Sequence, residues 1–128
     1  METQMTSEEH QAFLAETRVG IISIPEQRRE PLTVPVILTH IKVDDLALYT
    51  LGAEVFTEIG MEIKQMSSTS HTLFANVSNG CIGYLPTASE HALGGYEVDL
   101  SPYFYRLPGR LRADSAERVL EAVKNLQI

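Results

Sequence analysis

The chain has 128 residues, a length typical of one domain, so we treat residues 1–128 as a single domain. Its net charge of −7 argues against nucleic acid as a partner, because phosphate binding needs a basic surface. No apolar run approaches the roughly 20 residues of a membrane helix. The single cysteine and the acidic, polar N-terminus, which is unlike a signal peptide, predict a cytoplasmic protein.

The first third of the chain predicts a short helix and two extended segments. Thr6 and Glu9 form a capping box that starts a helix running to about residue 16. The β-branched stretch 18–24 is typical of a strand. Residues 31–36 form a second extended segment, and because Pro35 lacks an N–H this strand lies at a sheet edge or breaks there.

The middle of the chain predicts a hairpin followed by a helix. Residues 37–43 and 46–51 flank an Asp-Asp turn signal, and the second of these segments is apolar throughout, as in a strand covered on both faces. The helix that follows has one apolar face, made by Val55, Ile59, Ile63 and Met66.

Glu54 lies directly after the buried strand and at the expected start of that helix. The helix dipole favours a carboxylate there, so one interpretation is an N-terminal cap. The other is a ligand or acid/base group at the carboxyl end of a strand, where α/β sheets place their sites. The residues alone leave both open.

Residues 79–97, NGCIGYLPTASEHALGGYE, follow a predicted strand over 71–77 and have no single period. They combine an Asn-Gly turn, a short apolar strand, a small helix with a capping box of Thr87 and Glu90, and a glycine pair that ends on Tyr96. A long loop of this chemistry between apolar segments is where a site is expected. The alternative is that the glycine pair only makes a turn.

The C-terminal part predicts an aromatic, irregular stretch over 96–105, a basic loop over 106–112 and a last helix that begins at Asp114 with Glu117 as its capping-box partner. The apolar face of this helix is made by Val119, Leu120, Val123 and Leu126. The whole order predicts an α+β domain, a mixed β-sheet of about five to six strands with three to four helices packed on it.

Several kinds of chemistry are absent from the sequence. It has no phosphate loop, no dinucleotide fingerprint, no serine nucleophile elbow and no cysteine pair for structural zinc. The four histidines, at 10, 40, 71 and 91, form no local metal motif, so a metal site would need ligands from distant positions. Cys81 lies in an apolar strand and is expected to be buried and inert.

From about residue 41 to the end, the chain resembles the C-terminal part of the catalytic domain of the neutral/alkaline non-lysosomal ceramidase-like family. The matching stretches are IKVDDLALYTLGAEVFTEIGMEIK and HTLFANVSNGCIGYLPTASEHALGGYEVDLSPY. The resemblance implies a zinc-dependent hydrolase of the ceramide amide, and so a small-molecule or lipid-amide substrate. Zinc in this family is held by two histidines, a glutamate and a tyrosine.

The resemblance also implies site residues in this chain. The glutamate of the family's P-G-E motif falls on Glu54, and the tyrosine of its Y-E motif falls on Tyr96, so both are expected to be metal ligands. Asn79 and Tyr84 are expected to shape the substrate pocket. A phenolate beside a carboxylate on zinc is chemically reasonable, since the ion lowers the pKa of a bound phenol.

The chain departs from the family's pattern in three ways. P-G-E is Gly52-Ala53-Glu54, and the tyrosine usual after Asn-Gly is Cys81. The family's two histidine ligands and its serine nucleophile lie upstream, in a region that this chain does not contain. We therefore name no catalytic residue and expect a fragment or relative that is inactive alone. The missing ligands would come from His40, His71, His91 or another chain.

Residues 6–36, TSEEHQAFLAETRVGIISIPEQRREPLTVPV, resemble the opening of the flavin-binding split-barrel group that includes pyridoxamine-phosphate oxidases. This resemblance implies flavin as the alternative cofactor. It also raises the alternative that the chain is a fusion of segment 1–36 with the ceramidase-like segment 37–128. A third alternative is an interaction module without chemistry. In every case the apolar surface of a truncated sheet predicts a homo-oligomer.

Overall fold

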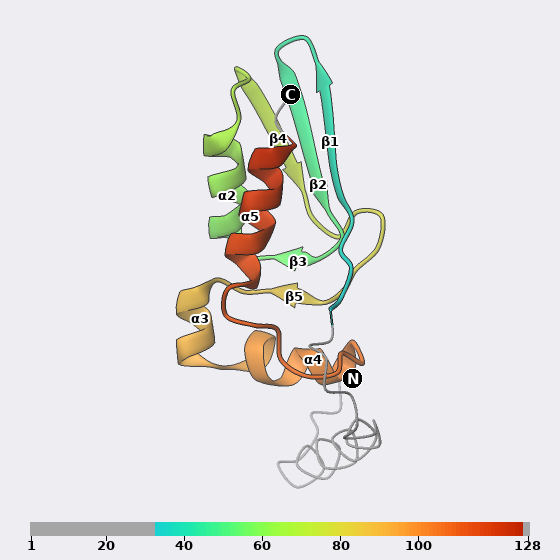
Figure 1. The fold of residues 1–128 in the computed structure, drawn as a ribbon, viewed down its shortest axis with the longest axis vertical. Helices are drawn as coiled ribbons and strands as arrows, with labels where there is room; N and C mark the ends of the chain where they lie inside the picture. Colours follow the sequence, from blue (N-terminus) through green and yellow to red (C-terminus); the bar gives the residue numbers. More distant parts are fainter. Residues whose placement is uncertain (1–32, 127–128) are drawn as a thin grey trace, which may run out of the picture.

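The structure is a computed structural model that describes residues 33–126 of the chain. Within them the fold is α+β, with five strands in two small sheets and four helices (Figure 1). The predicted fold class is confirmed, but the strands do not form the single mixed sheet that the sequence suggested. The predicted helix over 6–16 and the predicted strand over 18–24 lie outside the described residues, and residues 33–36 do not belong to a strand.

The larger sheet contains β1 (Leu38–Val43), β2 (Leu46–Leu51) and β4 (His71–Ala75), in the order β1-β2-β4. β1 and β2 are antiparallel and form the predicted hairpin, with Asp44 in the turn at a φ of 52°. β2 is also paired with β4, in parallel. The prediction that this strand is covered on both faces is wrong, because Ala47, Tyr49 and Leu51 are buried on one face whereas Leu46 on the other face is 41% exposed.

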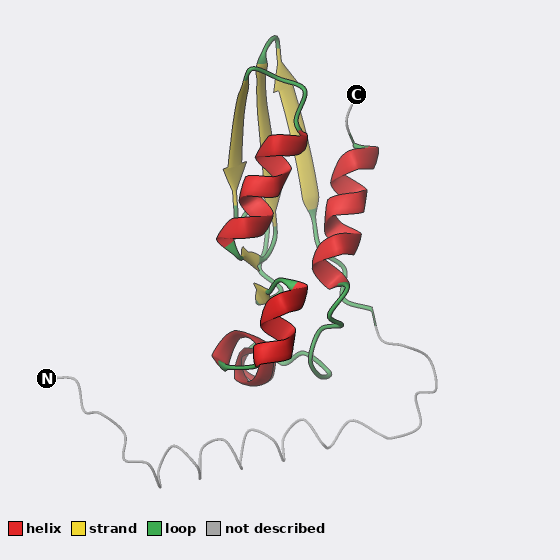
Figure 2. Cartoon of the chain, turned by 90° about the vertical axis from the view of Figure 1, so that its left-hand side faces the viewer, coloured by secondary structure: helices red, strands yellow, loops and turns green. Residues whose placement is uncertain are grey.

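Two helices, α2 (Thr57–Met66) and α5 (Ser115–Asn125), pack against one face of this sheet (Figure 2). Alternate β2 side chains point to that face and are buried with residues of both helices, which together make the core: Ala47, Tyr49, Leu51, Ile59, Ile63, Leu120 and Val123. The helix faces predicted around Ile63 and Val123 are therefore confirmed. Two residues predicted for these faces do not belong to them, because Val55 lies in a strand and Leu126 is exposed.

Gly60 occupies the middle of α2, where glycine costs helix stability. A Cβ atom at this position would lie 3.0 Å from a ring carbon of Phe74 in β4. The glycine therefore allows α2 to approach the sheet closely.

The smaller sheet is the parallel pair of β3 (Glu54–Val55) and β5 (Tyr84–Leu85). It is followed by α3 (Ala88–Leu93), where the Thr87 hydroxyl accepts a hydrogen bond from the backbone N–H of Glu90 at 3.4 Å. α3 ends at Gly94, as the sequence predicts.

The aromatic stretch 96–105 is not irregular, which corrects the sequence interpretation. It forms a single π-helical segment, η1 (Tyr96–Leu100), and then the short helix α4 (Ser101–Phe104). The backbone N–H of Ser101 donates to the carbonyl of Tyr96, and the Ser101 hydroxyl donates to the carbonyl of Glu97 at 2.7 Å. These bonds satisfy backbone groups that a loop would leave to water.

Asp114 stands at the N-terminus of α5 as predicted, but its side chain makes no capping bond. Its carboxylate instead accepts two hydrogen bonds from the Arg112 guanidinium, at 2.9 and 3.0 Å. The predicted capping box is therefore wrong, because a bidentate arginine outcompetes the backbone N–H groups for the carboxylate.

Among residues 33–126, no helix combines the length and the apolar character that crossing a membrane would require.

Candidate functional site

The strand β3 is held in place by backbone hydrogen bonds to the segment that leads into β5. The carbonyl of Gly52 accepts from the N–H of Ile82 at 2.9 Å, and the N–H of Glu54 donates to the carbonyl of Gly83 at 2.9 Å. This register sets Glu54 directly beside Tyr84. Residues 30 positions apart in sequence thus meet through main-chain contacts.

Glu54 is not the N-terminal cap of a helix, which corrects one of its two interpretations. It belongs to β3, and Phe56 is the residue that precedes the first turn of α2. The Glu54 carboxylate instead meets tyrosine hydroxyls, and the side chain is only partly buried. Glu54 is the first residue of β3, and its interpretation as a ligand or acid/base group stays a prediction.

Two tyrosines donate hydrogen bonds to the Glu54 carboxylate. The Tyr105 hydroxyl donates to Glu54 Oε1. A hydrogen bond to Glu54 is the main cause that raises the pKa of Tyr84 to about 12, with burial and the charge of the carboxylate adding to it. The hydrogen bond that Tyr105 itself donates to Glu54, and then burial, raises the pKa of Tyr105. Both phenols therefore stay protonated further into the alkaline range than free tyrosine, and they hold the carboxylate in place.

Gly83 makes the contact between Tyr105 and Glu54 possible. Its φ is +105°, a backbone conformation that side chains rarely adopt, and a Cβ atom there would lie 2.9 Å from two ring carbons of Tyr105. The tyrosine ring therefore packs directly on the glycine backbone.

Tyr96 contacts the ring of Tyr84. The centroids of the two rings are 5.9 Å apart in an edge-to-face arrangement, and the Tyr96 ring also lies 6.0 Å from that of Phe104. Tyr96 is 46% exposed and is the first residue of the π-helical segment. Since π-helical segments occur frequently at functional sites, its position agrees with a role in binding. Three of the four predicted site residues, Glu54, Tyr84 and Tyr96, thus lie together.

Asn79 is the predicted site residue that this group does not include. It is exposed, with a φ of 61°, and no hydrogen bond within residues 33–126 links its side chain to Glu54. Its neighbours Ser78 and Gly80 have carbonyl oxygens 3.4 Å from the point where a Cβ on Gly52 would lie. The Asn-Gly turn therefore packs on the backbone before β3, which is a structural contribution.

Sequence reasoning missed Tyr105 and misplaced Cys81. Cys81 is exposed, not buried, because the segment before β5 is too short and too bent to form the predicted strand. Its thiol hydrogen-bonds to Tyr105, so it borders the same group. The resemblance offered a signal for the position of Cys81, because the family usually has a tyrosine after the Asn-Gly pair. Tyr105 carried no signal, since it was one aromatic residue among several.

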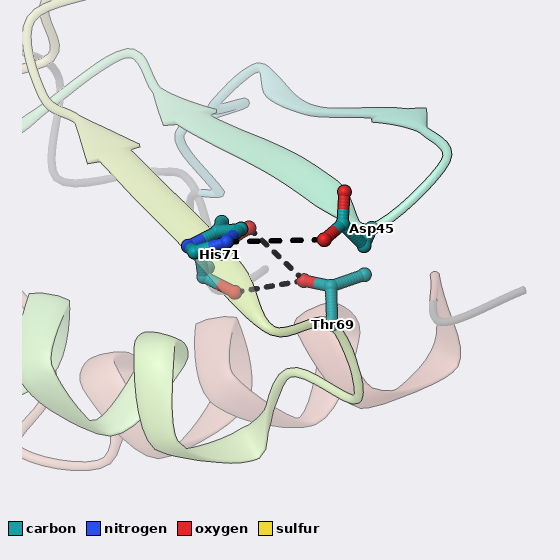
Figure 3. A network of polar contacts seen from close by, with 4 residues as sticks. Asp45, Thr69 and His71 are labelled. Carbon is teal, nitrogen blue, oxygen red and sulfur yellow. Dashed lines mark hydrogen bonds and ion pairs between the residues drawn. The ribbon is translucent and has the colours of Figure 1, made fainter.

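His71, one of the possible metal ligands, is the first residue of β4 and lies beside the hairpin turn between β1 and β2 (Figure 3). Its Nε2 atom is 3.8 Å from a carboxylate oxygen of Asp45 in the hairpin turn, and both side chains are exposed. The Thr69 hydroxyl donates to the His71 carbonyl at 3.2 Å. These contacts join the hairpin turn to the start of β4 and place His71 away from Glu54.

The other two histidines in the described residues also have separate surroundings. The His40 ring stacks on Tyr49 at a centroid distance of 4.3 Å, and His91 belongs to α3. Residues 33–126 contain no group of three or more histidine, cysteine, aspartate or glutamate side chains that could hold a metal ion. A zinc site takes about four ligands, so the described residues do not form a complete one.

Comparisons of the chain with protein-family models, with curated proteins and with solved structures gave no match. Both resemblances noted in the sequence therefore stay predictions.

Proposed function

We propose that this chain is a fragment or relative of a zinc-dependent ceramidase-like amidohydrolase that carries the glutamate–tyrosine side of the site and is inactive as a single chain. The observation that carries the proposal is the grouping of Glu54 and Tyr96 around Tyr84. These two residues are 42 positions apart in sequence, and both are the positions that the resemblance implies as ligands.

The proposal requires donors from elsewhere. Glu54 and Tyr96 supply two oxygen atoms, whereas zinc sites usually also contain nitrogen or sulfur ligands. Tyr84 and Tyr105 orient the Glu54 carboxylate by hydrogen bonds, which is how residues around a metal ligand commonly act. The proposal therefore needs nitrogen ligands from outside residues 33–126.

The substrate class is a small-molecule or lipid amide. Tyr96 and Phe104 are 46% and 42% exposed, and with Tyr84 they present aromatic rings next to the Glu54 carboxylate. Aromatic side chains with a polar tip suit a molecule that is apolar at one end and hydrogen-bonding at the other.

Zinc titration by calorimetry, with imidazole in the buffer to replace the missing histidine rings, tests the proposal. We expect the wild type to bind zinc, and Glu54→Gln and Tyr96→Phe each to bind it about tenfold more weakly or worse. Glu62→Gln, an exposed glutamate in α2, and Tyr103→Phe are the matched controls and should bind as the wild type does. Near-ultraviolet phenolate absorbance should rise on binding in every variant except Tyr96→Phe.

Equal zinc binding by the wild type and Glu54→Gln, or none by the wild type, would contradict the metal role. A lipid amide with a fluorogenic acyl chain should not be hydrolysed by the chain alone, because the nucleophile and the nitrogen ligands are missing. Hydrolysis that survives Glu54→Gln would point to a different site.

The flavin alternative depends on residues 6–36, most of which lie outside the described residues. An absorbance spectrum of the purified chain, before and after addition of flavin mononucleotide, tests it directly. A yellow protein would favour the alternative, and a colourless protein that takes up no flavin would contradict it.

A further inference from the structure

A second hollow of the molecule is separate from the Glu54 group. A cavity of about 370 Å³ lies between residues 33–36, β5, the loop 108–112 and α5. Figure 1 shows the chain between α4 and α5 passing beside β5 on its way to this helix. Consecutive strand residues point to opposite faces, so Tyr84 faces Glu54 while its neighbour Leu85 lines the cavity.

The cavity wall is largely apolar. Leu85 is buried, and four of the other lining side chains are partly buried hydrophobic residues that pack against the core. The apolar residues come from four different segments: Val34, Val36, Ile82, Leu85, Leu111 and Val119. Small-molecule sites usually have volumes of about 300–1,000 Å³ and mainly apolar walls with a few polar groups. This cavity has the size and the wall of such a site.

Three arginines, Arg110, Arg112 and Arg118, also line the cavity. Arg110 forms an ion pair with Asp99, and Arg112 forms one with Asp114. Arg118 is exposed, and its guanidinium makes no hydrogen bond or ion pair within residues 33–126. After the hydrogen bond from Arg112, its charge is one of the causes that lower the pKa of the Asp114 carboxyl. Arginine is charged at any physiological pH and binds carboxylates through two parallel hydrogen bonds. Among residues 33–126, Arg118 is therefore the cavity arginine whose guanidinium is not already held in an ion pair.

We propose that this cavity binds a fatty-acid-like carboxylate, with the alkyl chain against the apolar wall and the carboxylate on Arg118. The apolar wall disfavours a fully polar anion such as free phosphate, and the positive charge of Arg118 disfavours an alkyl amine. The site lies on the other face of the β3–β5 pair from Glu54, so this inference does not depend on the proposed function.

Calorimetric titration of the full chain with decanoate, below the concentration at which it forms micelles, tests the proposal. We expect one decanoate per chain, no binding of acetate, and affinity that rises about fourfold for each methylene added between hexanoate and decanoate. Decylamine, which has the same alkyl chain and the opposite charge, should not bind. This series uses only the wild type and so does not depend on any variant folding.

Two variants then locate the site. Arg118→Gln should weaken decanoate binding about tenfold or more, since it removes the charged partner. Arg106→Gln, an exposed arginine outside the cavity, is its control and should bind normally. Ala122→Phe, which fills the cavity from α5, should also weaken binding, whereas Ala113→Phe should not.

Three results would overturn the proposal. The first is decylamine binding as tightly as decanoate, which would mean an apolar surface without charge selection. The second is equal weakening by Arg118→Gln and Arg106→Gln, which would mean non-specific attraction to positive charge. The third is the absence of any dependence on chain length.

Discussion

The two sheets of this molecule are held together by different forces. The larger sheet and its two helices share a core in which Tyr49, Leu51 and Ile63 are at most 1% exposed. The β3–β5 pair contributes one residue, Leu85, to that core. Its other three side chains are partly buried, and the pair is fixed by backbone hydrogen bonds and by tyrosine hydroxyls on the Glu54 carboxylate. Apolar burial provides most of the stability of a domain, whereas polar contacts contribute little net free energy but define geometry.

The larger sheet and its helices therefore act as the scaffold, and the residues around Glu54 form the candidate site. A polar group that is partly exposed can exchange its partners for a ligand without the loss of a packed core. We therefore expect substitutions in the larger sheet to change stability, and substitutions around Glu54 to change the titration of tyrosines and the binding of ligands.

The largest effect is expected from Ile63→Ala in α2. Ile63 is 0% exposed and lies between the sheet and α5, so its truncation leaves a cavity that costs about 2–5 kcal/mol of unfolding free energy. Urea denaturation measures this change. Met61→Ala in the same helix is the control, since Met61 is 54% exposed and its truncation should cost little. A similar loss in both variants would show that this core is not the source of stability.

A smaller loss is expected from Gly83→Ala, which acts on the second region. The new methyl group would meet the Tyr105 ring at 2.9 Å on a backbone with a φ of +105°. Strain of this kind costs about 1–3 kcal/mol, and the ring must move away from Glu54. Gly109→Ala is the control, because nothing lies within 4 Å of its Cβ position. Unchanged stability in Gly83→Ala would contradict the tight contact.

The Glu54 group should also be visible in a spectrophotometric titration of the tyrosines. The hydrogen bond to Glu54 raises the pKa of Tyr84 from 10.0 to about 12, so Glu54→Gln should return this titration toward 10. Glu62→Gln should leave the titration curve as in the wild type. If Glu54→Gln also left it unchanged, the contact between Tyr84 and Glu54 would be absent in solution.

The same pKa shift makes stability depend on pH in the alkaline range. Above pH 10 the unfolded chain loses the Tyr84 proton while the folded chain keeps it up to about pH 12. The unfolded state therefore binds fewer protons, and this contribution to stability is fully present below pH 10 and is lost as pH rises toward 12. Urea denaturation at about pH 9 and about pH 11 should show a smaller loss in Tyr84→Phe than in the wild type. An equal loss would contradict the shift.

Parts of the fold that depend on neighbouring residues could be predicted from the sequence. The Asp44 turn of the hairpin, the buried face of α2 around Ile63 and the capping of α3 by Thr87 all have local signals, and each is confirmed. The resemblance predicted Glu54 and Tyr96, and these residues lie in one group through Tyr84.

The parts that were predicted wrongly depend on contacts between distant segments. Glu54 belongs to a strand because residues 82–85 pair with it, and no local pattern shows that pairing. The π-helical turn after Tyr96 depends on Ser101, which looked like part of a loop. The role of Tyr105 depends on a glycine more than 20 residues earlier. Local propensity cannot report contacts of this kind.

The smallest effect on stability is expected on the uncovered face of the larger sheet, where the effect should appear in assembly. Ile41, Val43, Leu46 and Leu73 are each at least 41% exposed, and their face of the sheet carries no aspartate, glutamate, lysine or arginine within β1, β2 and β4. Repulsion between chains of net charge −7 is weakest at such a face, so we expect two copies to associate there. Leu73→Lys should leave the urea midpoint of dilute protein unchanged but shift the mass measured by light scattering from dimer to monomer. Lys64→Leu, which adds an apolar group on α2 away from this face, should not change the mass. A wild type that is monomeric at high concentration would show that the exposed apolar face does not drive self-association.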